Sequence, residues 1–391
     1  MAALAALAAT SAFAQVSLTG RASMDYSTFE ATGATAGAAS DFRSRARIAD
    51  TASRITFSAN EDLGGGMRAG VYCETGINID SGNANGQANT ANANTSEFCS
   101  REGRAYIGSG DYELRLGRQN VWWTQGALNQ TGSTFLGSDA MTNLINGGAG
   151  VYGVRLENMV KVAVTKGAFN GSELYTGFMG AATGEAAAVN TDANGKYSGF
   201  KLQYTAGQFV ALLDQQSSNN SPATAAAAAV VGARSFKRSA VKYGLGFKYN
   251  PTSIVSIQMW DKKRTDIADG TRAFNQTVAV NTTNEGNAKD SGYGIQVHHD
   301  LGGGWMAHAQ YAKANNIKGT TTGEIANTGA TGMTLGATKS LSKRTHVYGS
   351  YHKITNQSAA IYGMGGGNYQ SGTANAGADT KMMALGMIHN F

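Results

Sequence analysis

The chain has too little charge for an ordinary soluble protein and no apolar run long enough for a membrane helix. Only 15% of its 391 residues are charged, against roughly 25% in soluble globular domains. The apolar fraction, 42%, does not rise to compensate, and Ala, Ser, Thr, Asn and 52 Gly fill the gap. No stretch approaches the ~18 apolar residues of a spanning helix, since the longest candidate, 223–233, is an alanine run after Pro222. A helical membrane protein is therefore excluded.

Signatures of enzymes, metal sites and nucleic-acid binding are missing as well. The sequence contains no HExxH, GxSxG or Walker motif. His298 and His299 are adjacent, and neighbouring strand residues point to opposite faces, so they cannot share one metal. The net charge of +6 comes from arginines and lysines dispersed over the chain, with no basic aromatic stripe. We expect no catalysis, no cofactor, no metal and no nucleic-acid partner.

The first fourteen residues predict export. They are apolar and end in Ala12-Phe13-Ala14, which fits a signal-peptidase site before Gln15. A complete signal peptide starts with a basic segment, yet no charged residue precedes Arg21. We therefore interpret 1–14 as a partial signal peptide and 15–391 as the mature domain. The alternative is an alanine-rich helical start to a cytosolic protein.

The rest of the chain alternates with a period of two, as strands do. In 239–250, Val241, Tyr243 and Leu245 share one face, and Lys242 and Gly244 share the other. One face suits lipid and the other suits water. The pattern predicts sixteen strands, at 16–28, 53–62, 67–79, 97–109, 112–119, 150–156, 159–169, 197–205, 208–216, 239–249, 252–263, 291–300, 304–315, 332–340, 345–356 and 380–391.

Short and long connections alternate strictly between these strands. Seven tight turns are expected at 62–66, 109–111, 157–158, 206–208, 250–251, 301–304 and 341–344, and eight long loops at 29–52, 80–96, 120–149, 170–196, 217–238, 264–290, 316–331 and 357–379. Both prolines fall in connections, where their missing N–H does no harm. This pattern predicts an all-β, sixteen-stranded antiparallel transmembrane barrel with short periplasmic turns, long extracellular loops and a water-filled lumen.

Several motifs in order carry a family resemblance. They are Arg54-Ile55-Thr56-Phe57, Glu61-Asp62-Leu63-Gly64-Gly65-Gly66-Met67, the run 112–119, Leu341-Ser342-Lys343-Arg344-Thr345, and His389-Asn390-Phe391. Together they resemble the general trimeric porins of betaproteobacteria, the neisserial and anion-selective group. The resemblance implies an outer-membrane homotrimer surrounded by lipid and lipopolysaccharide. It also implies that the barrel-assembly machinery reads Phe391, and that small anions and hydrophilic solutes diffuse through.

In the resembled family the third long loop folds inward and narrows the channel. Here that loop is 120–149, which contains Trp123 and a single charge, Asp139. A short helix is expected within it, capped by Ser138 and running to about Ile145. The alternative is an outward surface loop with an incidental helical turn.

The register of each strand places basic residues inside the barrel. They are Arg54, Arg68, Arg104, Arg115, Arg155, Lys242 and Lys248, opposed chiefly by Glu74, Glu102 and Glu113. A low-dielectric wall focuses the field of such charges, which favours small anions. Anion-selective relatives are similar, with arginines at positions matching Arg54, Arg104 and Arg155. The alternative is that the arginines only pair with lumenal carboxylates and stiffen the wall.

Cys73 and Cys99 flank the loop 80–96 and share strand parity, so a hairpin centred near residue 86 would place them opposite each other. A disulfide suits the oxidising periplasm, and two buried thiols are the alternative.

Two other functions stay open. One is an outer-membrane barrel enzyme, a protease or phospholipase, although His346 and His352 lack an evident Ser and Asp pairing. The other is an adhesin or phage receptor, which the long loops would suit.

Overall fold

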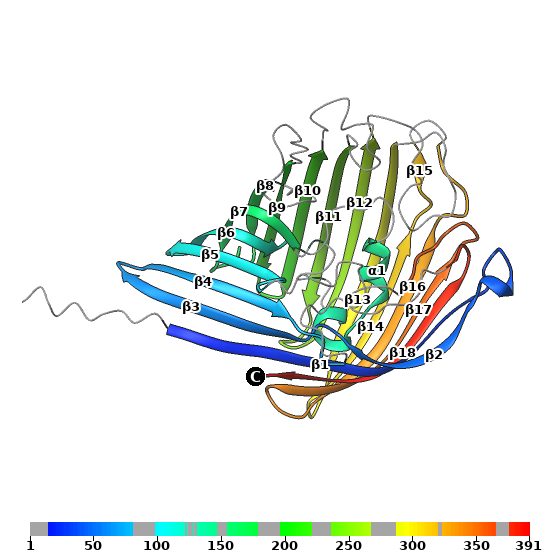
Figure 1. Ribbon diagram of the computed structural model, residues 1–391, viewed down its shortest axis with the longest axis horizontal. Helices are drawn as coiled ribbons and strands as arrows, with labels where there is room; N and C mark the ends of the chain where they lie inside the picture. The colour runs from blue at the N-terminus through cyan, green and yellow to red at the C-terminus, as the bar shows by residue number, and fades with distance from the viewer. Residues whose placement is uncertain are drawn as a thin grey trace, which may run out of the picture.

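The computed structural model describes residues 15–80, 98–121, 123, 128, 131–146, 155–178, 196–220, 236–266, 287–319, 323–364 and 375–391. Figure 1 shows long strands arranged around a common interior that also contains a short helix. The predicted signal segment 1–14, Pro222 and most of the expected loops 80–96, 170–196, 217–238 and 264–290 lie outside the described residues. No helix in the described ranges is both long and apolar enough to cross a membrane.

The strands follow the chain in order around the barrel. They are β1 (Gln15–Thr32), β2 (Phe42–Asp50), β3 (Arg54–Gly64), β4 (Met67–Gly76), β5 (Glu102–Ser109), β6 (Tyr112–Asn120), β7 (Arg155–Val164), β8 (Glu173–Phe178), β9 (Lys196–Ala206), β10 (Phe209–Asn220), β11 (Phe236–Lys248), β12 (Ile254–Asp266), β13 (Asn287–Gly302), β14 (Trp305–Ala314), β15 (Lys318–Gly319), β16 (Ala330–Ser340), β17 (Thr345–Asn356) and β18 (Asp379–Asn390). The helical pieces are η2 (Ala38–Ser40), η3 (Thr131–Leu136) and α1 (Ala140–Asn146).

Eighteen labelled strands make sixteen strands of wall. β2 and β3 both pair with β1, at Met24↔Asp50 and Arg21↔Arg54, so they are one strand interrupted at 51–53. β15 has two residues, which pair with Ala288 and Lys289 at the start of β13 and form a single bridge to Glu324. The remaining strands pair antiparallel in sequence, and β18 pairs with β1. The predicted sixteen-stranded, closed, all-β barrel is confirmed.

The seam between β1 and β18 is completed by the last residue of the chain. The backbone N–H of Gly20 donates to the Phe391 carbonyl at 2.9 Å, and the Phe391 N–H donates to the Gly20 carbonyl at 3.0 Å. The Phe391 ring lies over Gly20, where an added Cβ would be 2.3 Å from the ring. Glycine is therefore required opposite this aromatic ring.

Side chains alternate between the two surfaces of the wall. Leu18, Leu245 and Leu385 are more than 60% exposed on the outer surface, whereas the lumenal Gln258 and His352 are buried. Because successive Cβ atoms point to opposite faces of a strand, this alternation gives an apolar exterior and a polar interior.

Six of the seven predicted tight turns are confirmed by the strand ends. Gly64, Gly65 and Gly66 all have positive φ, at 78°, 61° and 79°. Glycine adopts such angles without steric cost, which explains the triple glycine between β3 and β4. Pro251 lies in the turn between β11 and β12, as expected.

The seventh turn, at 157–158, is wrong. β7 runs through Glu157 and Asn158, and the register shift between Gly117 and Gln119 sets these two residues against Arg118 alone. A bulge of this kind breaks the alternation just as a turn does. The predicted strands at 150–156 and 159–169 are therefore replaced by one strand, with residues 150–154 outside the described part.

The missing strand is β8, which lies inside the expected loop 170–196. Its pairing with β9 is fixed by two reciprocal contacts, because the Tyr175 ring lies over Gly199 and the Tyr197 ring lies over Gly177. An added Cβ would lie 2.4 Å from the Tyr175 hydroxyl and 2.2 Å from the Tyr197 hydroxyl. Aromatic rings that cover strand glycines pin the register of a sheet. The prediction divided β7 into two strands and missed β8, and because these two errors cancel, the predicted total of sixteen is correct.

The expected loop 29–52 is also mostly strand. β1 continues to Thr32 and β2 covers 42–50, so the connection is only 33–41. Arg45 and Arg47 pair with Phe29 and Ser27 across β1 and share their lumenal face. Arginines at alternate positions hide the apolar–polar period by which the other strands were predicted.

The two-faced wall predicts opposite effects for adjacent substitutions in β9. Leu202→Arg places a charge on the outer surface, where Leu202 is 44% exposed, and should lower the free energy of unfolding by up to about 2–4 kcal/mol. Gln203→Arg, one residue further on the lumenal face, should change it little. Chemical unfolding in lipid vesicles measures both, and equal losses would contradict the assignment of faces.

Candidate functional site

The described part of the third loop lies inside the barrel, between β6 and β7 in sequence, and α1 is visible within the ring of strands (Figure 1). Its backbone and side chains bond to the lumenal wall. The Thr131 hydroxyl donates to Gln296 Oε1 at 3.1 Å, and the N–H groups of Ala140 and Met141 donate to Thr334 Oγ1 at 2.9 Å and Gln310 Oε1 at 3.0 Å. The loop is thus fastened to β13, β14 and β16.

The helix in this loop begins one residue later than predicted. α1 spans Ala140–Asn146, and Asp139 Oδ1 accepts from the Thr142 N–H at 2.7 Å while Oδ2 accepts from its hydroxyl at 2.8 Å. Asp139, not Ser138, is therefore the N-cap, because the capping side chain must reach the N–H groups of the first turn. Asp139 is also 1% exposed, so the one charge of the predicted loop is used inside it.

Two imidazoles of the wall pack against η3. Phe135 stacks on His308 with 4.8 Å between ring centroids and meets His298 edge-on at 5.2 Å. His299 contacts the Tyr249 hydroxyl instead, at 2.8 Å from Nδ1. His298 and His299 therefore point to opposite faces. Within the described ranges, no three His, Cys, Asp or Glu side chains are grouped to hold a metal ion.

A row of alternating charges crosses the lumenal face from β7 to β13. Glu173, Lys201, Asp214 and Lys242 are direct cross-strand neighbours on successive strands. The ion-pair distances are 3.0 Å for Lys161–Glu173, 3.5 Å for Lys201–Glu173, 3.9 Å for Lys242–Asp214 and 3.3 Å for Lys262–Asp290. Four lysines thus meet three carboxylates, and the row is nearly neutral.

Lys242 lies on the predicted face but not beside open lumen. It is 1% exposed, its ammonium donates to the Trp123 carbonyl, and its Nζ is 5.5 Å from the centroid of the Trp123 ring. Lys262 similarly donates to the Ile145 carbonyl at 2.7 Å. Both lysines hold the third loop against the wall. Lys248 is half-buried on the same face of β11 as Lys242.

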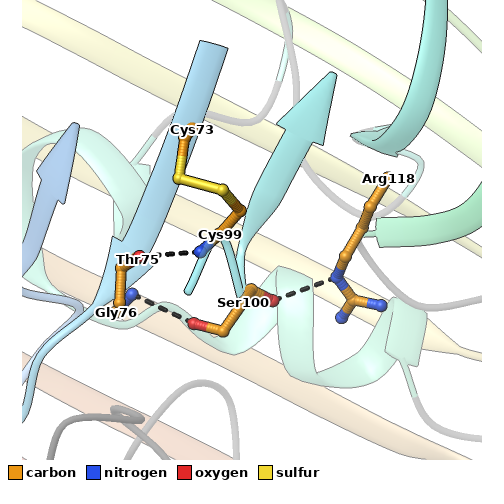
Figure 2. The surroundings of a disulfide bond; sticks show 6 residues. All are labelled: Cys73, Thr75, Gly76, Cys99, Ser100 and Arg118. Atoms are coloured by element: carbon orange, nitrogen blue, oxygen red, sulfur yellow. Dashed lines mark hydrogen bonds between the residues drawn. A yellow bond between two sulfur atoms is a disulfide. The ribbon is translucent and has the colours of Figure 1, made fainter. Parts of the chain in front are cut away.

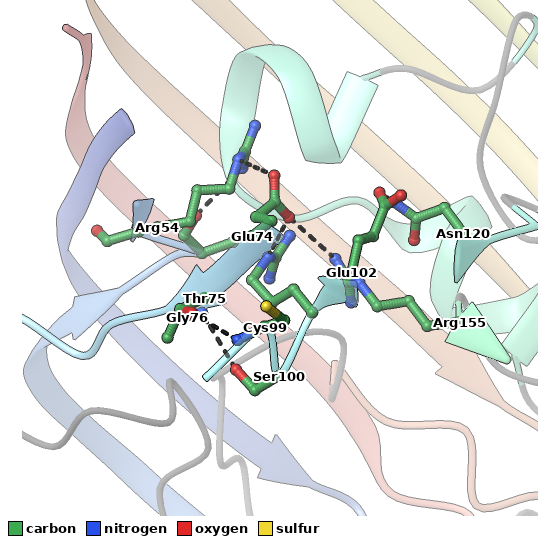
Figure 3. Close-up of polar contacts among 12 residues, drawn as sticks. Arg54, Glu74, Thr75, Gly76, Cys99, Ser100, Glu102, Asn120 and Arg155 are labelled. Atoms are coloured by element: carbon green, nitrogen blue, oxygen red, sulfur yellow. Dashed lines mark hydrogen bonds and ion pairs between the residues drawn. The ribbon is translucent and has the colours of Figure 1, made fainter. Parts of the chain in front are cut away.

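Arginines dominate the wall from β3 to β7, and three of them converge on Glu74. Arg101 Nε lies 2.6 Å from Glu74 Oε1, Arg54 Nε lies 3.1 Å from Oε2, and Arg155 Nη2 lies 4.0 Å from Oε1. Figure 3 shows Arg54 and Arg155 reaching Glu74 from different strands. One carboxylate cannot neutralise three guanidinium groups, so this cluster keeps a net positive charge.

The other predicted arginines on this wall each have a carboxylate partner. Arg104 pairs with Glu102 and lies 4.1 Å from the centroid of the Tyr72 ring. Arg115 and Arg68 share Glu113, at 2.6 Å and 3.2 Å. Arg118, which the sequence analysis did not select, pairs with Glu157. Arg118 pairs with Gly103 across the ladder and so lies on the opposite face from Arg104. Without it, six arginines face three glutamates on the lumenal side.

The two cysteines lie beside the Glu74 cluster. Cys73 in β4 and Cys99 form a disulfide, with 4.7 Å between their Cα atoms (Figure 2). The ladder, however, pairs Cys73 with Gly103, so the predicted opposition of the cysteines across a hairpin is wrong. Residues 98–101 leave the ladder, and Cys99 folds back over Gly103, where an added Cβ would lie 2.9 Å from Cys99 Cβ.

The disulfide segment holds arginines in place. The Cys99 N–H donates to Thr75 Oγ1 at 2.9 Å, and the Ser100 carbonyl accepts from Arg118 Nε at 3.0 Å. Arg101 follows directly and reaches Glu74. Strand parity could not find Arg101, because it precedes β5. Lys161 and Lys201, by contrast, lie in predicted strands, where the same parity argument would have found them.

Comparison with known proteins agrees with this architecture. Residues 1–359 match the family model described as Gram-negative porin. The chain belongs to the Gram-negative porin family, and it is an outer-membrane β-barrel channel rather than an enzyme. The predicted class, membrane and absence of enzymatic activity are confirmed by this match.

Individual relatives are more distant. Outer membrane porin protein 32 of Delftia acidovorans is 26% identical over 346 residues, which cover 87% of this chain and 84% of the relative. The anion-selective porin from Comamonas acidovorans has a TM-score of 0.69 at 21% identity, covering 97% of this chain and all (100%) of that one. The trimer form of OmpT from Vibrio cholerae has a TM-score of 0.62 at 10% identity, with 97% and 100% coverage. Both solved structures have the same fold as this chain.

The disulfide can be tested by electrophoresis. Denatured wild-type protein should migrate faster without reductant than with it, because the bond closes a segment with a sequence separation of 26 residues. A Cys73→Ser, Cys99→Ser variant should show no shift and should lose about 3.5 kcal/mol of unfolding free energy. Equal mobility of the wild type with and without reductant would show that the thiols are free.

Proposed function

We propose that this porin passes small hydrophilic solutes by passive diffusion and prefers small anions. The observation that carries the proposal is the excess of arginine on one side of the lumen. Charges on a low-dielectric wall act strongly on ions in a narrow aqueous path, because the wall focuses their field. Arg54, Arg101 and Arg155 around Glu74 form the densest part of this excess.

The position of the third loop supports the same path. The loop is fastened to β13, β14 and β16 and contacts the buried lysines of β11 and β12. Its charge Asp139 is buried, so the loop adds no exposed carboxylate from its described residues to oppose the arginines. Solutes would then pass between a neutral loop and a basic wall.

The alternative, that the arginines only stiffen the wall, accounts for part of the geometry. Arg104 and Arg115 have close partners and stabilise the sheet. Arg54 keeps 27% of its side chain exposed, compared with 8% for Glu74, which places positive charge at the water boundary. A similar fold in a protein described as an anion-selective porin gives further support.

We also propose a homotrimer, as the trimer form of OmpT exemplifies for a similar barrel. An apolar groove on the outer surface supports a protein contact there. It crosses β1, β2, β14 and β16–β18, and its lining includes Met24, Tyr26, Ile48, Trp305, Leu385 and Met387.

Phe391 is 46% exposed, which keeps it accessible for recognition by the barrel-assembly machinery. Adhesin or phage-receptor activity of the loops is compatible with these roles.

Selectivity is measured by the reversal potential of purified channels in a planar bilayer under a potassium chloride gradient. We expect the wild type to favour chloride, because unneutralised guanidinium groups line the path. The Arg54→Ala, Arg101→Ala, Arg155→Ala variant should lose most of that preference, and Glu74→Gln should strengthen it. Arg344→Ala, which removes one positive charge from a turn outside the lumen, is the control. A wild-type preference for potassium would contradict the proposal.

The trimer is tested by the same recordings. Three lumens in one assembly should close in three steps of equal conductance at high voltage. Single-step closure, together with a monomeric mass in detergent by light scattering, would contradict the trimer.

A further inference from the structure

The wall under the third loop has glycines on its lumenal face. They are Gly244 and Gly246 in β11, Gly294 in β13, and Gly332 and Gly336 in β16. Glycine weakens a strand because it loses more backbone entropy on folding than other residues and has no side chain to pack against its neighbours. Five of them facing one loop require an explanation other than strand propensity.

Each glycine is covered by an apolar side chain of the loop. An added Cβ would lie 2.8 Å from Leu128 at both Gly244 and Gly246, 2.5 Å from Met141 at Gly294, and 2.6 Å from Leu136 at Gly336. At Gly332 it would lie 2.9 Å from Ala140 Cβ and 3.0 Å from Leu144 Cδ1. Leu128, Leu136, Met141 and Leu144 are all fully buried.

Gly294 and Gly332 give the clearest evidence. At Gly294 all three nearest atoms belong to Met141, and at Gly332 all three belong to Ala140 and Leu144. At Gly244 and Gly336, by contrast, a backbone carbonyl of the wall is also close, so these two glycines serve the sheet as well. Ala140 cannot rotate away from a neighbour, so a Cβ at Gly332 must displace the helix itself.

Hydrogen bonds hold the loop at this depth. Thr334 lies between Gly332 and Gly336 on the same lumenal face and accepts from the Ala140 N–H at 2.9 Å. Gln310 on the neighbouring strand accepts from Met141 at 3.0 Å. The glycines remove the side chains that would separate these partners, and the polar residues between them bind the loop backbone.

We propose that this glycine seat, Gly244, Gly246, Gly294, Gly332 and Gly336, determines the size limit of the channel. By letting the loop lie directly on the backbone of β11–β16, the seat keeps the path beside the arginines open. A filled seat would lift the loop toward the arginine wall and narrow the path. This inference rests on the proposed diffusion function, in which the loop borders the path.

The test is a rescue experiment on purified channels. Gly332→Ala should move α1 by about 1 Å, the difference between the clash and normal contact, and should lower single-channel conductance by roughly 1.5-fold. Adding Ala140→Gly removes the opposing methyl group and should restore the conductance. Leu335→Val is the matched control, because Leu335 lies on the outer face of the same strand, 46% exposed, and its loss of one methylene should leave conductance unchanged.

A second pair keeps the proposal testable if Gly332→Ala fails to fold. Gly294→Val should also lower conductance, and Met141→Ala in the same chain should restore it. If conductance falls and neither Ala140→Gly nor Met141→Ala restores it, the glycines serve only the sheet. If conductance does not change in the glycine variants, the glycines do not set the position of the loop. Either result overturns the proposal. The reversal potential of the wild type separates the two proposals. A wild type that does not favour anions would contradict the proposed anion preference, while the conductance tests of the glycine seat would remain valid.

Discussion

The hydrogen-bonded seam between β1 and β18 is the interaction on which the rest of the structure depends. In hydrocarbon every unpaired backbone amide or carbonyl costs several kcal/mol, so a sheet can span the membrane only when it closes on itself. The backbone pairs between Gly20 and Phe391 extend that closure to the last residue of the chain. Closure then fixes the two faces of each strand. The outer side chains must suit lipid, and the inner ones are free to carry charge.

The lumen divides its charge between two walls. From β7 to β13 a nearly neutral row of lysines and carboxylates is covered by the third loop, and Lys242 and Lys262 bind loop carbonyls. From β3 to β7 the arginines outnumber their partners and stay partly exposed. The loop itself is held mainly by apolar packing, since Met141, Leu144 and Ile145 are fully buried in one cluster with Tyr362 and Met364. Each such side chain contributes about 1.5–3 kcal/mol, which allows a loop with so few charges to keep its position.

Most of the wall could be predicted from the period-two pattern, because one face of each strand meets lipid and the other meets water, so apolar and polar residues alternate along the sequence. The pattern failed where the backbone departs from a regular ladder. The bulge at Glu157 and Asn158 looked like a turn, and β8 was missed because its register depends on the rings of Tyr175 and Tyr197 lying over glycines. Parity found Arg54, Arg104 and Arg155. It could not find Arg101, which leaves the ladder behind the disulfide, or show that Lys242 is buried under Trp123, because both depend on packing between distant segments.

The central claim is that positive charge at the water boundary is concentrated around Glu74, opposite a loop seated on the other wall. A crystal structure of the channel grown in bromide tests it most directly, because the anomalous signal of bromide marks where anions reside. The account predicts bromide in the lumen beside Arg54, Arg101 and Arg155. Bromide along the Lys161–Lys262 row instead, or a lumen in which the third loop lies away from β16 and the arginine cluster attracts no anion, would contradict it.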